Sequence, residues 1–164
     1  MFTKNGTKSN ILEGFDGMED QTLLVNQGFK TPAMRVDFLQ GNGKVELGSL
    51  GTVKPMSAPS LTIGQHLDDG TQQVKFTLDN ECDAIEFVYV GLKGFCEEGF
   101  TLTTYDSNGH QLENKQQKLI DDSTARYFNI NSKGTKSFTI LDYFGGNPGA
   151  KNTFTIDNFI FSTE

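Results

Sequence analysis

Hydrophobic and polar residues alternate in short runs along most of the chain. From 32 to 39, and again from 73 to 78, apolar side chains occupy every second position. A period of two is typical of a half-buried strand, because successive side chains point to opposite faces of a sheet. Glycine, proline, asparagine and aspartate interrupt these runs every 8–12 residues or so, at roughly the spacing of an antiparallel sandwich or barrel. We therefore predict an all-β fold of about ten short strands with little or no helix.

Three further segments refine this prediction. The run from Ala84 to Leu92 is apolar at both odd and even positions, which indicates a central strand that is covered on both faces. The segments 100–105 and 111–119 flank an Asn-Gly turn and are predicted to form a hairpin, since these residues accept the positive φ that such a turn needs. The Gly-, Pro- and Ser-rich stretch from 48 to 60 is predicted to be a mobile loop.

The alternation is irregular in one strand near the C-terminus, from Phe154 to Phe161. Phe154 and Ile156 would share one face of this strand, whereas Phe159 and Phe161 share a face with the opposite phase. Either the strand is apolar on both faces, or a β-bulge near Asp157 shifts the phase between the two pairs. A bulge re-aims a side chain, and here it would re-aim the Asp157 carboxylate.

Composition narrows the functional classes. The chain has 164 residues, which suits one domain, and we place a single β-sandwich domain at 10–164 behind a polar, frayed segment at 1–9. A net charge of −7 argues against nucleic acid and against a polybasic membrane contact. No run reaches the roughly 20 apolar residues of a membrane helix. The first residues also lack the apolar core of a signal peptide, so either the protein is not exported by that route or a leader has been removed.

Catalytic chemistry finds little support, and we do not expect an enzyme. There is no Gly-x-Ser-x-Gly motif, no cysteine or histidine pair at zinc-ligand spacing, and no carboxylate pair that stands out as a glycosidase acid and base. His66 and His110 lie in segments predicted to be polar turns, where we expect solvated side chains. Cys82 and Cys96 flank the strand at 84–92, which would hold them too far apart for a disulfide, so we predict two free thiols.

Calcium fits the acidic, glycine-rich turn near the N-terminus. This cation takes about six to eight oxygen ligands from carboxylates, carbonyls and amides. Glu13, Asp16 and Glu19 offer carboxylates in the turn, and Asp157 would join them if the first and last strands pair. The alternative is that Asp157 accepts backbone N–H groups at a bulge and holds no metal.

Sugar binding needs exposed aromatic rings beside hydrogen-bonding groups, because ring faces stack on sugar C–H groups while polar side chains read the hydroxyls. Tyr105, Tyr127 and Tyr143 are the candidate rings, and Asn147 is a candidate polar contact. The chain has 14 Phe and no Trp, and we assign most of the phenylalanines to the core.

Several segments together resemble bacterial extracellular jelly-roll domains of the galactose-binding-like, carbohydrate-binding-module type. The matching segments are ILEGFD at 11–16, AIEFVYV at 84–90, FTLTTYDSNG at 100–109, YFNIN at 127–131 and FTIDNFIF at 154–161. The resemblance implies two facing antiparallel sheets with the first and last strands adjacent. It also implies a structural calcium between those strands, near Glu13, Asp16 and Asp157, and an extracellular or cell-surface location.

We therefore expect a non-catalytic binding module that recognises a glycan or another cell-surface ligand through loops at one end of the sandwich. The loops concerned are 48–60, 95–99 and 143–151. The alternative is a structural or interaction protein, either an assembly subunit or a secreted, host-directed, toxin-like factor with a protein or membrane target. An exposed apolar patch would favour the alternative, and a polar cleft with an exposed tyrosine would favour the binding module.

Overall fold

The computed structural model describes residues 9–67, 70–143 and 150–163, which form eleven β-strands and no helix. The strands are β1 (Ser9–Glu13), β2 (Gln21–Leu23), β3 (Gly28–Lys30), β4 (Met34–Gly41), β5 (Lys44–Gly48), β6 (Ser60–Gln65), β7 (Gln72–Cys96), β8 (Gly99–Tyr105), β9 (Gln111–Lys118), β10 (Arg126–Leu141) and β11 (Asn152–Thr163). Every pairing between them is antiparallel. The prediction of an all-β antiparallel sandwich is confirmed. Among the described residues, there is no helix with the length and apolar character that crossing a membrane requires.

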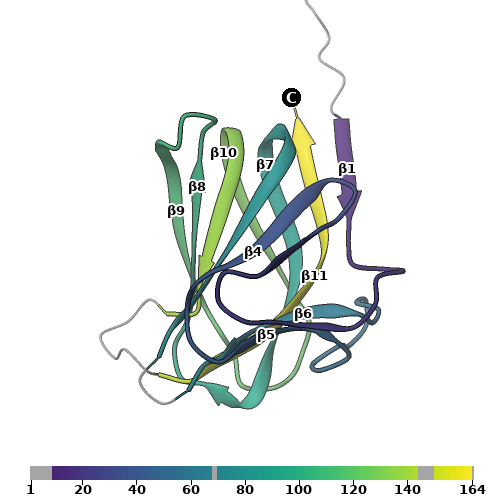
Figure 1. Cartoon of the computed structure of the whole chain (residues 1–164), viewed down its shortest axis with the longest axis vertical. Coiled ribbons are helices and arrows are strands. Elements are labelled where there is room, and N and C mark those ends of the chain that lie inside the picture. The colour runs from purple at the N-terminus through teal and green to yellow at the C-terminus, as the bar shows by residue number, and fades with distance from the viewer. Residues whose placement is uncertain (1–8, 68–69, 144–149, 164) are drawn as a thin grey trace, which may run out of the picture.

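The sandwich has two layers that share the long strands β7 and β10 (Figure 1). One layer runs in the order β3-β4-β7-β10-β8-β9, and the other in the order β2-β5-β6-β11-β7-β10. The first half of β7 pairs with β4, where Phe76 lies opposite Val36, and its second half pairs with β11, where Tyr89 lies opposite Ile156. Strand β1 pairs with β11, so the predicted adjacency of the first and last strands is confirmed.

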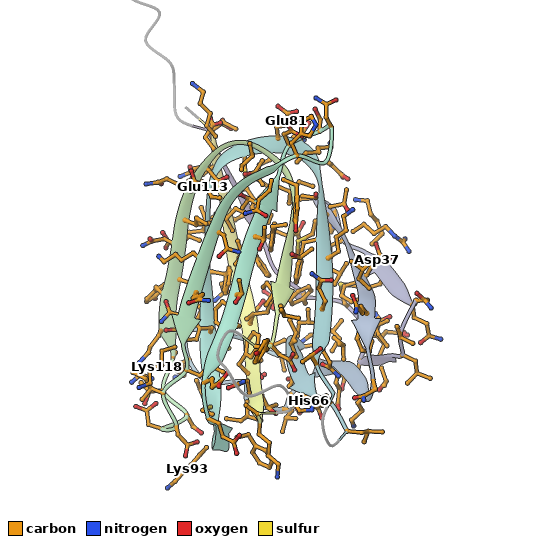
Figure 2. All side chains as sticks on the ribbon, turned by 90° about the vertical axis from the view of Figure 1, so that its left-hand side faces the viewer. Asp37, His66, Glu81, Lys93, Glu113 and Lys118 are labelled. Carbon is orange, nitrogen blue, oxygen red and sulfur yellow. The ribbon has the colours of Figure 1, made fainter. Side chains whose placement is uncertain are left out.

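The lengths of β7 and β10 differ from the prediction of short strands. Asp79, Asn80 and Glu81 directly follow the alternating run at 73–78 and are residue types typical of a turn, but β7 continues through them. Register shifts between β7 and β10 on either side of Thr135 let this pair of strands bend from one layer into the other. The polar residues lie at the bend, where Glu81 stands at the top of the molecule, so they mark a change of layer and not a strand end (Figure 2).

The core between the layers is dominated by phenylalanine, as predicted. The fully buried rings are Phe15, Phe38, Phe76, Phe87, Phe100, Phe128, Phe138, Phe154 and Phe159. Phe76 and Phe138 stack at 4.6 Å between ring centroids, and Phe159 contacts both of them. The alternating runs at 32–39 and 73–78 place their apolar members in this core, which confirms their assignment as half-buried strands.

The second apolar face of β7 has a separate cover. Val88 and Val90 point away from the main core and pack with Met56, which lies in the loop between β5 and β6. This small cluster explains why the run from 84 to 92 is apolar at both odd and even positions. The prediction of a central strand is therefore confirmed.

Two local predictions also hold. Strands β8 and β9 form the expected hairpin, in which Asp106 Oδ1 accepts the N–H groups of Asn108 and His110 at 2.8 and 2.9 Å. Both cysteines, Cys82 and Cys96, are free thiols.

Candidate functional site

The irregularity in the last strand is a β-bulge. The pairing of β11 with β7 shifts register between Asp157 and Ile160, and Asn158 adopts a positive φ of 55°. Because of this shift, Ile156 before the bulge and Phe159 after it both face the main core. Of the two alternatives raised by the sequence, the bulge is the one that occurs.

The bulge places the Asp157 side chain under the loop between β5 and β6. Its Oδ2 atom accepts the Ser57 N–H at 3.4 Å, and the Ser57 hydroxyl donates to Asp16 Oδ1 at 2.6 Å. Only 1% of Asp157 is exposed, and its Oδ1 atom accepts no hydrogen bond from the described residues. Burial raises the pKa of Asp157 and the negative charge of Asp16 adds to the rise, although the nearby backbone N–H groups of Asn158, Ser57 and Phe15 act in the opposite direction.

The four predicted calcium ligands do not come together as one set. Glu13 is buried, but its carboxylate accepts the N–H groups of Ala33 at 2.6 Å and Gly14 at 3.2 Å. Glu19 lies on an exposed segment. Among the described residues, no group of three or more acidic, histidine or cysteine side chains is arranged to hold a metal. Asp16 and Asp157 are therefore the two predicted ligands that the fold brings to one place.

The chemistry of this pair still fits a hard cation. Two carboxylates share Ser57, and one of their oxygens is buried without a donor. A buried carboxylate that lacks a partner is destabilising, and a divalent cation would satisfy both its charge and its free lone pairs. Calcium would take its remaining oxygens from backbone carbonyls and water.

The outer face of β1, β11, β7 and β10 carries a second arrangement of polar and apolar side chains. Strand register sets these side chains in rows across the four strands. One row consists of Asn131, Ala84, Ser162 and Asn10. The next consists of Asn129, Glu86, Ile160 and Leu12. In the third row, Tyr127 lies opposite Val88, which pairs on its other side with Asp157.

Two adjoining cavities follow these rows, and together we call them the sheet-face groove. The first has a volume of about 670 Å3 and is lined by Asn10, Asp83, Ala84, Asn131, Ser132, Lys133, Ser162 and Thr163. The second has a volume of about 380 Å3 and is lined by Leu12, Glu13, Gly14, Asp16, Pro55, Glu86, Val88, Tyr127, Asn158, Phe159 and Ile160. The Asp16 end of the groove therefore adjoins the calcium candidate.

Tyr127 is the predicted ring that the structure presents to solvent. Tyr127 is 64% exposed on the groove, where the Glu86 carboxylate and the Asn158 amide line the same cavity. Tyr105 and Tyr143 are only partly exposed and line neither cavity of the groove. Tyr105 lies in β8 opposite Ser137, in the other layer, and the backbone carbonyl of Tyr143 accepts the Thr101 hydroxyl at 2.9 Å. Asn147 lies outside the described residues.

Sequence reasoning missed the polar residues of the groove, which include Asn10, Glu86, Asn131 and Ser162. Each of them alternates with core residues, and this signal marks an outward position. The sequence gives no register, however, and register alone decides which outward positions share a row.

The prediction for His66 was wrong. Its side chain is 3% exposed, and its Nε2 atom lies 3.1 Å from the Ala150 carbonyl oxygen and 3.7 Å from Asp142 Oδ2. Burial raises the pKa of Asp142 to about 6, although its Oδ1 atom accepts the Gln72 N–H at 2.7 Å. His110, in contrast, is exposed as predicted.

Comparisons with known proteins identify the fold. No protein-family model and no curated protein sequence matches the chain. The K2 cleaved adhesin domain of Lys-gingipain is similar in structure, with a TM-score of 0.55 and 10% identity over 93% of this chain and 99% of that one. Two mutants of CBM29-2, a family 29 carbohydrate-binding module, have TM-scores of 0.53 and 0.50 at 10% and 11% identity, over 88% of this chain and 92% of theirs. The chain has the jelly-roll fold of carbohydrate-binding modules, as the resemblance implied.

Proposed function

We propose that the protein is a non-catalytic, extracellular module that binds a glycan in the sheet-face groove. The observation that carries this proposal is the exposed Tyr127 ring among hydrogen-bonding side chains on an open sheet face. The fold supports it, because carbohydrate-binding modules have the same fold. The absence of a nucleophile motif in the sequence is in keeping with binding without catalysis.

The groove offers the two kinds of contact that a sugar chain requires. The Tyr127 ring provides a face for stacking on sugar C–H groups, and Leu12, which is 76% exposed, adds an apolar surface across the sheet. Asn131 and Ser162, in the first row, provide amide and hydroxyl groups. Glu86, in the next row, provides a carboxylate acceptor between them and the Tyr127 ring. The groove follows several rows along the strands, which suits an extended chain of sugars better than a single terminal sugar.

Binding by wild type on a glycan array, followed by calorimetry with two variants, tests this proposal. Tyr127→Ala removes the stacking face and should weaken binding of any glycan hit by about 1–2 kcal/mol, or roughly five- to thirtyfold. Tyr127→Phe keeps the ring and serves as the matched control, with affinity close to wild type. Equal affinity of the alanine variant and wild type would refute the sheet-face groove as the glycan-binding site. Binding to a protein target, with no glycan bound at all, would favour the interaction-protein alternative.

We also propose that calcium binds at Asp157 and Asp16 and stabilises the fold. The buried Oδ1 atom of Asp157 and the shared Ser57 contact support this site. Such an ion would hold the bulge of β11 and the loop between β5 and β6 in place, next to the Asp16 end of the groove. Glu13 and Glu19 are not part of this proposal, because Glu13 is bonded to backbone N–H groups and Glu19 is exposed to solvent.

A further inference from the structure

A third cavity lies away from the groove, and we call it the loop-end cavity. Its volume is about 810 Å3, and it is lined by Leu24, Gly43, Lys44, Leu50, Gly64, Gln65, His66, Leu67, Leu92, Phe95, Lys151 and Thr153. His66 marks its position at the lower end of the sandwich, opposite the bend at Glu81 (Figure 2). It shares no lining residue with the groove, so it is a separate site.

The lining of the loop-end cavity is strongly apolar. Leu24, Leu50, Leu67 and Phe95 are among the large hydrophobic side chains that the described part of the chain exposes to solvent, and all four line this cavity. They come from separate segments of the sequence that meet at one end of the sandwich. A cavity of this size, lined by apolar groups with a few polar ones, is typical of a small-molecule site.

The polar groups of the cavity are predominantly donors. Lys151 Nζ lies over the Phe95 ring, 5.9 Å from its centroid, and makes no ion pair with any described residue. Lys44 lies on the same lining and pairs with Glu46 at 2.8 Å. Gln65 Nε2 is a buried N–H donor that makes no hydrogen bond of normal geometry to a described residue, although it lies near the Glu46 carboxylate, whose pKa Lys44 and Gln65 lower. An anionic group in the cavity would have an ammonium and an amide available to bind it.

We propose that the loop-end cavity binds a small amphipathic acid, which has an aliphatic or aromatic body and one anionic head group. The leucines and Phe95 enclose the body, and Lys151 pairs with the head group. The body of the ligand is better matched by an aliphatic or aromatic group than by a sugar, because Leu24, Leu50, Leu67, Leu92 and Phe95 form a continuous apolar lining that cannot bind hydroxyls. The loops that the sequence singled out do meet here, through Leu50, Phe95 and Lys151, but their chemistry selects an apolar ligand.

Fluorescence titration with 1-anilinonaphthalene-8-sulfonate, an aromatic acid, tests the apolar part of the proposal. Leu67→Ser should raise its dissociation constant roughly fivefold, because it removes apolar surface from a residue that is already 65% exposed. Leu39→Ser is the matched control, because Leu39 is another exposed leucine that does not line the cavity. If Leu67→Ser unfolds, Leu24→Ser gives the same readout. Equal binding by wild type and a folded cavity variant would overturn the proposal.

Displacement of the bound probe tests the anionic part. Decanoate should displace the probe from wild type at a lower concentration than decanol does. Lys151→Gln should abolish that preference and leave the concentration of decanol needed for displacement unchanged. Equal displacement by the two compounds from wild type would overturn the assignment of Lys151. Vesicles of phosphatidylglycerol should leave the probe in place, because the cavity takes a free acid. Displacement by the vesicles but not by decanoate would show a membrane surface to be the ligand and would refute the proposal.

Discussion

Replacement of Asp157 by asparagine tests the physical basis of the calcium proposal. The side chain is 1% exposed, and its Oδ1 atom has no hydrogen-bond donor in the described structure. Leaving a buried polar atom unsatisfied costs about 1–3 kcal/mol, and more if the group is charged. Asparagine has the same shape and no charge, and its carbonyl keeps the acceptor for the Ser57 N–H. The amide nitrogen that takes the place of Oδ1 also lacks a partner, so the gain comes only from removal of the buried charge. In EDTA, Asp157→Asn should therefore raise the free energy of unfolding by roughly 1 kcal/mol.

Calcium should reverse this order of stability. A ligand that binds only the folded state adds about 2.7 kcal/mol when its concentration is 100 times the dissociation constant. The wild type should gain this stabilisation, and Asp157→Asn should gain little, because it lacks the carboxylate that holds the ion. Thermal unfolding in EDTA and in calcium chloride measures both effects, at about 2–4 °C per kcal/mol for a chain of this length. Asp16→Asn is the companion variant, and it should lose calcium stabilisation as well.

The pH dependence gives an independent check on the same reasoning. The pKa of Asp157 is raised in the folded state, so the metal-free folded protein binds its proton more tightly than the unfolded chain does. The free energy of unfolding in EDTA should therefore fall as the pH rises above about 4, and Asp157→Asn should reduce that slope. The reasoning is refuted if the variant is the less stable protein in EDTA, or if calcium stabilises both proteins equally.

Three further variants test the fold. Phe159→Ala should lower the free energy of unfolding by about 3–5 kcal/mol in urea titrations, because Phe159 is buried at the centre of the aromatic core; a loss below about 1 kcal/mol would contradict that position. Burial raises the pKa of Asp142 to about 6, so the free energy of unfolding should fall by up to about 3 kcal/mol between pH 4 and 6. Asp142→Asn should remove that fall, and a pH profile equal to that of wild type would refute the assignment to Asp142. Gly64→Ala should destabilise the protein far more than its control, Gly109→Ala. Both glycines have positive φ, but only at Gly64 would a Cβ atom lie 1.9 Å from the Asn152 carbonyl oxygen. Equal melting temperatures of the two variants would contradict this close approach.

Much of the fold could be predicted from alternation alone. The bulge in β11 could be located within a residue or two, because the phase of Phe154 and Ile156 conflicts with that of Phe159 and Phe161. The continuity of β7 could not be predicted in this way. The polar residues at its bend have the composition of a turn, and only the pairing with β10 in both layers keeps them within one strand.

The candidate sites depend on long-range register, which local patterns do not contain. Asn10 and Ser162 are neighbours on the groove although nearly the whole chain separates them. Exposure of Tyr127 follows from its outward position in β10, yet Tyr105 and Tyr143 look equivalent to it in the sequence. The burial of His66 likewise depends on long-range contacts, because its side chain lies against Asp142 and Ala150, which are far from it in the sequence.

The central claim is that the sheet-face groove is the glycan-binding surface. Titration of isotope-labelled protein with a glycan identified on the array, followed by amide chemical-shift mapping, tests it most directly. The account predicts that the largest shifts fall on the groove strands, around Glu86, Tyr127, Asn131 and Ser162, and that Tyr127→Ala needs roughly five to thirty times more glycan to reach them. Shifts concentrated instead around Leu67, Phe95 and Lys151 at the loop end, or spread over neither surface, would contradict it.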